Sequence, residues 1–189
     1  DFNEYVAAAP EGRGLAEFYM FNRVGDRVIS YYSIVPGLIN LPTHYAARLI
    51  GVDNFAEYQL LGRITATLCT AGSVFFMAWI LLGLCRQTST AIIFTLVYAF
   101  ATSAWSVAAT ALWQHGPSLL FLCAAFAGLC SRHRLGALFA GLMLGMAVWN
   151  RLPNGGYALM TGLYLALYRP KDLLVFLAGA SVPALGLFS

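Results

Sequence analysis

The acidic residues are spread very unevenly along this chain, and this asymmetry limits what the chain can fold into. Seven of the eight Asp and Glu residues lie in residues 1–63, and Asp172 is the only one after Arg63. Hydrophobic residues make up 60% of the 189 residues and charged residues 10%, whereas soluble domains carry about 25% charged residues. We therefore expect a polar, aromatic-rich region at 1–63 and a membrane-embedded region at 64–189.

The second region consists of apolar runs separated by short polar turns. A transmembrane helix needs about 20 apolar residues, and a shorter run can borrow flanking residues or lie in a thinned bilayer. The sequence therefore predicts an all-α polytopic membrane protein with about six transmembrane helices, the middle three of them short. We also expect the chain to be a piece of a longer protein. The predicted spans are 64–84, 91–113, 117–130, 135–149, 155–168 and 173–189.

The charges of the turns predict an orientation. Every second turn is basic, and Lys and Arg are enriched on the cytoplasmic side of membrane proteins. Residues 1–63 and the turns 114–116 and 150–156 would then share the outer face, which is periplasmic if the membrane is a bacterial inner membrane. The basic residues expected on the cytoplasmic face are Arg86, Arg132, Arg134, Arg169 and Lys171.

Residues 1–63 are rich in aromatic side chains, which indicates a folded region. Two β-rich runs around Gly25 and Asp26 predict a small hairpin within 18–32. The run 43–51 predicts a short helix lying in the membrane interface. Asn54 and Glu57 have the spacing of a capping box, which would start a long helix that continues into the first span.

Several chemistries are absent from the sequence. There is no phosphate-binding glycine loop, no zinc-protease motif and no hydrolase nucleophile motif. The four cysteines lie within or at the ends of apolar runs without CxxC spacing, so we predict apolar packing and no disulfide or metal site. The formal net charge of +3 does not indicate a nucleic-acid partner. No acid lies inside a predicted span, which argues against a proton- or cation-coupled transporter core.

The polar residues of the outer face are the candidates for function. Arg151 follows a predicted span on the face where the charge rule disfavours Arg, and its planar guanidinium suits a phosphate. His115 and Gln114 could hydrogen-bond a phosphate or a sugar hydroxyl, or could simply be interfacial residues. The candidate set is Arg27, Tyr31, Tyr32, Ser33, Trp113, Gln114, His115, Asn150 and Arg151, with Asp1 and Glu4 as weak candidates for a catalytic base.

Three stretches resemble a known family. "LWQHGPS" at 112–118, "GMAVWNRLP" at 145–153 and "GDRVISYYSIVPGLINLP" at 25–42, which follows "DFNEY" at 1–5, are similar to motifs of GT-C type membrane glycosyltransferases. The resemblance is to the protein-mannosyltransferase-like group that uses polyprenyl-phosphate sugars. It covers essentially the whole chain, and its motifs are loose.

The resemblance implies an activity and a set of roles. The implied reaction moves a sugar from a polyprenyl phosphate to a lipid, glycan or protein acceptor at the outer face, and it places a recurrent arginine of the family at Arg151. The family's outer-face Asp and first span would lie upstream of residue 1. Some relatives carry a Lys before the loop proline, where this chain has Ser33 and no Lys. The phosphate contact would therefore fall to Arg27 or Arg151. The need for a divalent metal stays open.

Two other functions remain possible on the sequence. A multi-pass transporter or lipid-flipping protein would carry polar residues in mid-membrane, whereas Gln114 and Asn150 lie at the ends of predicted spans. A membrane scaffold without a site would explain the apolar runs but not the aromatic-rich region at 1–63.

Overall fold

The computed structural model describes residues 21–24, 27–30, 33–51, 55–131 and 133–187. The chain divides into two compact units, residues 1–33 and 34–189, and each is described here by itself. The elements in chain order are β1 (Phe21–Val24), β2 (Arg27–Ser30), α2 (Val35–Leu49), α3 (Phe55–Leu84), α4 (Thr88–Phe100), η2 (Ala104–Ala108), α5 (His115–Cys130), α6 (Arg134–Asn150), η3 (Leu152–Asn154), α7 (Gly155–Tyr168) and α8 (Pro170–Leu187).

The first unit contains two short strands. β1 and β2 pair antiparallel, with Phe21 opposite Ser30 and Val24 opposite Arg27. The predicted turn residues, Gly25 and Asp26, lie outside the described residues. The structure therefore supplies a strand pair within the range 18–32, and the turn that would complete a hairpin stays a prediction.

Helix α2 is longer than the helix predicted at 43–51 and begins earlier. Pro36 lies in its first turn, where the missing N–H costs nothing, and Pro42 lies inside the helix. The helix ends at Leu49, and Gly51 follows with a φ of 79°, which glycine adopts without steric cost. The predicted helix began at residue 43, directly after Pro42, whereas α2 continues through this proline.

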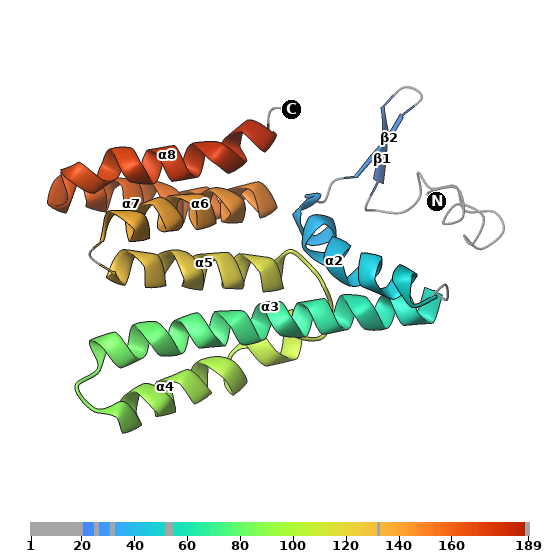
Figure 1. Ribbon diagram of the computed structural model, residues 1–189, viewed down its shortest axis with the longest axis horizontal. Helices are drawn as coiled ribbons and strands as arrows, with labels where there is room; N and C mark the ends of the chain where they lie inside the picture. Colours follow the sequence, from blue (N-terminus) through green and yellow to red (C-terminus); the bar gives the residue numbers. More distant parts are fainter. Residues whose placement is uncertain (1–20, 25–26, 31–32, 52–54, 132, 188–189) are drawn as a thin grey trace. The chain divides into compact units, whose positions relative to one another are not determined.

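The helices of the second unit pack mainly through α5 and α6. Figure 1 shows α3 and α5 lying side by side, with α6 beyond α5 and α8 packed on α6. One core cluster joins α5, α6, α7 and α8 through Ala125, Ala140, Leu144, Leu165 and Phe176. A second cluster brings Val35 of α2 against Phe121 and Ala147. The second cluster holds α2 beside the end of α6, where the candidate site lies.

The contact between α6 and α8 depends on small residues. A Cβ atom added to Gly141 would collide with the Phe176 carbonyl oxygen, and one added to Gly179 would collide with the Leu138 carbonyl oxygen. Glycine at both positions therefore lets the two backbones approach each other, as in tightly packed helix pairs of membrane proteins. Helices α6 and α8 are therefore closely packed against each other at these two glycines.

The second predicted span, 91–113, is wrong as a single helix. Helix α4 ends at Phe100, and a separate π-helical turn, η2, follows at Ala104–Ala108. The Thr102 hydroxyl donates to the Tyr98 carbonyl at 2.6 Å and accepts from the Ala104 N–H at 3.2 Å. The side chain thus offers the backbone an alternative to helical pairing, which ends α4.

The prediction of about six transmembrane helices is also wrong. Among the described residues, Gln59–Leu84 is the one helical stretch long enough and apolar enough to cross a membrane. Helices α4, α5 and α6 are apolar but shorter than 18 residues, and α8 uses its first turn for Pro170, Lys171 and Asp172. A helix of 16 residues such as α5 reaches about 24 Å, less than the roughly 30 Å of a hydrocarbon core. Apolar composition therefore predicted where helices occur but not how long they are.

Candidate functional site

The two turns that the sequence singled out meet in the structure. α5 begins at His115, α6 ends at Asn150, and the helices pack against each other, so the first turn of α5 lies beside the end of α6. Arg151 Nη1 lies 3.2 Å from His115 Nδ1. Both side chains are exposed. An arginine and a histidine 36 residues apart thus lie in direct contact on the surface at this end of the unit.

Two buried asparagines, Asn150 and Asn154, form a hydrogen-bond network beside this pair, called here the buried amide network. Asn150 is 1% exposed, and its Nδ2 donates to the Gln114 carbonyl at 2.7 Å and to Ser118 Oγ at 2.8 Å. Asn154 is also buried, and its Nδ2 donates to Ser118 Oγ at 3.0 Å and to the Ala147 carbonyl at 2.8 Å. These bonds connect the start of α5 to the end of α6 and to η3. They hold the backbone on both sides of Arg151 and His115.

One atom of this network has no partner. Asn150 Oδ1 is buried and makes no hydrogen bond in the described structure. Its amide nitrogen donates to the Gln114 carbonyl, and exchanging the oxygen and nitrogen positions would lose this bond because two carbonyl oxygens cannot pair. Buried acceptors of this kind are uncommon, and they concentrate where a protein binds something or stores strain.

The backbone around the pair is partly open. A Cβ added to Gly155 or Gly156 would meet no atom within 4 Å, so packing does not require glycine there. Gly116 is different, because its Cβ would lie 3.2 Å from the Ala108 carbonyl and 3.9 Å from that of Ala66. Gly116 therefore seats α5 closely against η2 and α3, whereas the turn after Arg151 faces open space.

The other candidates from the sequence are only partly brought to this site. Trp113 is 47% exposed and lies two residues before His115. Gln114 contributes its carbonyl oxygen, and no hydrogen bond of its side chain is recorded. Arg27 in β2 and Ser33 belong to the first unit. Asp1, Glu4, Tyr31 and Tyr32 lie outside the described residues.

Sequence reasoning missed Ser118 and Asn154. Ser118 follows Gln114 by four residues, which is the spacing of neighbours on one helix face, whereas Asn154 lies beyond the end of α6, in η3. The spacing of Ser118 was a readable signal. Their partners across the two helices were not, because they depend on how α5 meets α6.

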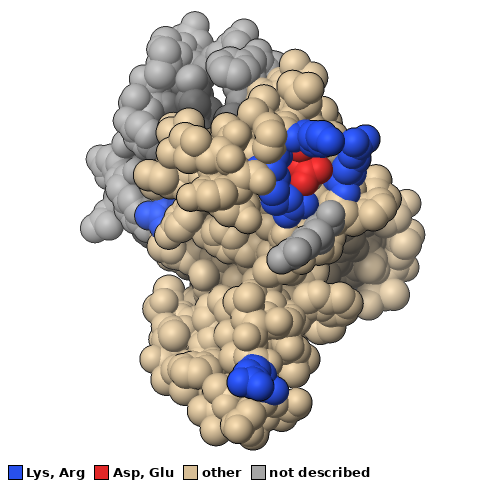
Figure 2. Space-filling model, turned by 90° about the vertical axis from the view of Figure 1, so that its left-hand side faces the viewer, with Lys and Arg blue, Asp and Glu red and all other residues tan. Residues whose placement is uncertain are grey.

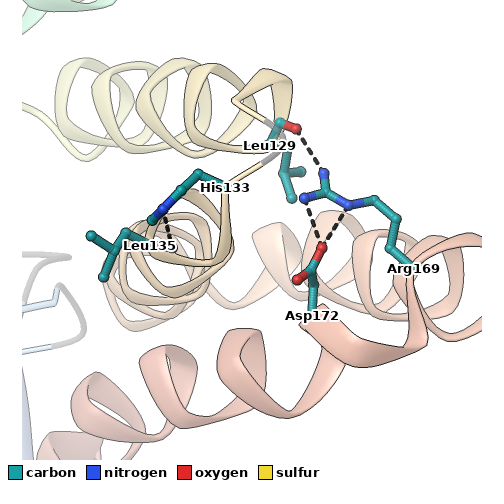
Figure 3. A network of polar contacts seen from close by, with 5 residues as sticks. All are labelled: Leu129, His133, Leu135, Arg169 and Asp172. Carbon is teal, nitrogen blue, oxygen red and sulfur yellow. Dashed lines mark hydrogen bonds and ion pairs between the residues drawn. The ribbon is translucent and has the colours of Figure 1, made fainter.

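The opposite end of the unit carries a different arginine arrangement. Figure 2 views this end and shows Lys and Arg side chains gathered around an acidic one. In Figure 3, Arg169 points toward Asp172 and toward the last turn of α5. Arg169 Nε donates to Asp172 Oδ2 at 2.7 Å and Nη1 donates to the Leu129 carbonyl at 3.0 Å. Nη2 lies 2.7 Å from the same carboxylate, as an ion pair rather than an aligned hydrogen bond. This guanidinium caps α5 and joins it to α8.

Cysteine and metal chemistry add nothing to the candidate site. All four cysteines are free, and Cys69 and Cys123 are buried. Among the described residues, no group of three or more His, Cys, Asp and Glu side chains could hold a metal ion.

Comparison of the chain with protein-family models, with curated proteins and with solved structures gave no match. The resemblance to GT-C glycosyltransferases therefore rests on the three sequence stretches given above.

Proposed function

We propose that this chain is a membrane-embedded glycosyltransferase that binds the phosphate of a polyprenyl-phosphate sugar through Arg151. The observation that carries the proposal is the exposed Arg151 guanidinium, held beside His115 on a buried amide network. Residues 59–158 contain no Asp or Glu, so no carboxylate on these segments competes for this cation. A planar guanidinium in open surroundings suits the two-point recognition of phosphate oxygens.

The membrane placement is supported by α3. Its apolar stretch Gln59–Leu84 has 26 residues and reaches about 39 Å, enough to cross a hydrocarbon core of about 30 Å. Only 22% of its most apolar window is buried inside the protein, whereas the core helix of a soluble protein is mostly buried. Helix α4 likewise exposes several large apolar side chains, and a large exposed apolar patch is rare on a soluble monomer. These are Ile92, Ile93, Phe94, Leu96, Val97 and Phe100.

An orientation follows from the end of α3. Arg86 comes directly after this helix, and the charge rule assigns it to the cytoplasm. The start of α5 lies against Ala66, about 10 Å along the helix from Gln59 and about 27 Å from Leu84. The Arg151–His115 pair is thus nearest to the outer end of α3. In a bacterium this site would face the periplasm from the inner membrane.

The proposed reaction needs little beyond positioning and charge. An acceptor hydroxyl of a lipid, glycan or protein attacks the anomeric carbon, its proton passes to a base, and the bond from that carbon to the phosphate oxygen breaks. Negative charge then grows on the departing polyprenyl phosphate, where Arg151 stabilises it. Residues 59–158 supply no carboxylate base, and the weak candidates Asp1 and Glu4 lie outside the described residues.

The proposal is tested by sugar transfer from a polyprenyl-phosphate donor, with the chain in detergent. Arg151→Ala removes a charge-assisted bond worth about 1.5–3 kcal/mol, so turnover should fall about ten- to hundredfold. Arg151→Lys should restore only part of this, because an ammonium cannot make the two-point contact. Arg86→Ala is the matched control, since Arg86 is an exposed arginine next to the other end of α3.

Unchanged turnover in a folded Arg151→Ala variant would show that Arg151 only anchors the chain at the interface. Equal losses in Arg151→Ala and Arg86→Ala would point to a general charge effect and would equally contradict the proposal.

A further inference from the structure

The contact between Arg151 and His115 determines where the imidazole carries its proton. A guanidinium can only donate hydrogen bonds, so Nδ1 of His115, 3.2 Å from Nη1 of Arg151, must be the acceptor. The ring in this contact is therefore neutral and carries its proton on Nε2. A protonated ring would place two donors face to face and would repel the guanidinium.

The groups that surround His115 lie on α5 itself and on the segments packed against it. His115 is the first residue of α5, where the helix dipole disfavours a cation. Of the described segments packed on α5, α3 carries Glu57, Tyr58, Arg63 and Cys69, α6 carries Arg134 at its far end, and η2 has no titratable residue. Helix α2, whose Val35 meets Phe121 of α5, carries His44, Tyr45 and Arg48.

Beyond α6, η3 has no titratable residue and the start of α7 carries Tyr157. Residues 59–158, which include His115 and Arg151, contain no Asp or Glu.

From these contacts we infer that binding of a phosphate diester at Arg151 is coupled to uptake of a proton by His115. The inference rests on the proposed function for the identity of the ligand. An anion held by Arg151 would lie next to the imidazole and would bring a negative charge to it. The ring then takes a proton from solvent at Nδ1 and changes from an acceptor for Arg151 to a donor for the phosphate.

This change suits the proposed reaction. The donor phosphate is a diester with one negative charge, whereas the departing polyprenyl phosphate is a monoester that carries up to two. A protonated His115 beside Arg151 would balance the second charge as the bond to the sugar breaks. An imidazole is suited to this role because it changes charge in the physiological pH range.

The experiment uses dibutyl phosphate as the probe, because a phosphate diester does not titrate near neutral pH. Binding to the full chain in detergent is measured calorimetrically at pH 7 in two buffers of different ionisation enthalpy. The difference between the two heats gives the number of protons taken up. We expect a clear fraction of one proton for the wild type, and binding that tightens about tenfold from pH 8 to pH 6.

The decisive variant is His115→Asn, whose side-chain oxygen can still accept from Arg151 but cannot titrate in this range. It should bind the diester with little proton uptake and with less than about a twofold change over the same pH interval. His133→Asn is the matched control, because His133 Nδ1 accepts from the Leu135 N–H at the opposite end of α6 and Asn can keep that cap. This control should behave as the wild type.

Binding without proton uptake, or uptake that persists in His115→Asn, would overturn the inference. Failure of wild-type binding would overturn it as well. Proton-coupled binding in a chain that transfers no sugar would support the inference and refute only the proposed glycosyl transfer.

Discussion

Arg151 and Arg169 lie at opposite ends of the same helical unit and are used in opposite ways. Arg169 is 17% exposed, is paired with Asp172 and caps the last turn of α5. Arg151 is exposed, and its recorded side-chain partner is the imidazole of His115. A guanidinium paired with a carboxylate and a carbonyl has its charge already balanced inside the fold. A guanidinium beside a neutral imidazole keeps its charge available for an anion.

The two ends of helix α6 lie next to these two differently paired arginines. α6 begins next to the Arg169 end and finishes next to the Arg151 end, so its packing sets the positions of both. The Arg169 contacts close the bundle. The hydrogen bonds of Asn150 and Asn154 fix the backbone beside Arg151, whose side chain is exposed.

The largest effect is expected from disturbing the element that both ends share. Gly141→Ala would push a methyl group into the Phe176 carbonyl, which should lower the free energy of unfolding by about 2–3 kcal/mol. Gly162→Ala in α7 meets no atom within 4 Å and should raise stability by up to about 1 kcal/mol through helix propensity. Thermal unfolding in detergent measures both. Equal shifts in the two variants would show that the α6–α8 contact is looser than described.

A smaller effect is expected at the Arg169 end alone. Asp172→Asn keeps an acceptor for Arg169 but removes its charge, so stability should fall by about 1 kcal/mol, the difference between charged and neutral hydrogen bonds. Sugar transfer per folded molecule should stay unchanged, because Arg151 is untouched. A loss of turnover larger than the loss of folded protein would mean that the two ends are coupled and would weaken the comparison.

Sequence patterns located the helices better than they described their role. The apolar runs at 117–130 and 135–149 correspond closely to α5 and α6. Their number of membrane crossings was wrong, because composition does not reveal that Thr102 ends α4 or that α5 is too short to span a bilayer. Length is set by capping and tertiary contacts, which an apolar run does not encode.

The sequence predicted only part of the candidate site, because tertiary contacts determine the rest. Alternation of the turns predicted that His115 and Arg151 share a face. Their direct contact and the support from Ser118 and Asn154 depend on the packing of α5 on α6. The spacing of three residues between Arg169 and Asp172 would have predicted their ion pair, yet the sequence analysis grouped Arg169 only with the basic residues of the cytoplasmic face.

The central claim is that Arg151, and not Arg169, holds a phosphate. It is tested most directly by solid-state NMR of the chain with ¹⁵N-labelled arginine side chains and bound dibutyl phosphate. Dipolar coupling between guanidinium nitrogen and phosphorus reports proximity of a few ångströms. We expect this coupling in the wild type and in Arg169→Ala, and its loss in Arg151→Ala at a ligand concentration that saturates the wild type. Coupling that persists in Arg151→Ala would contradict the claim.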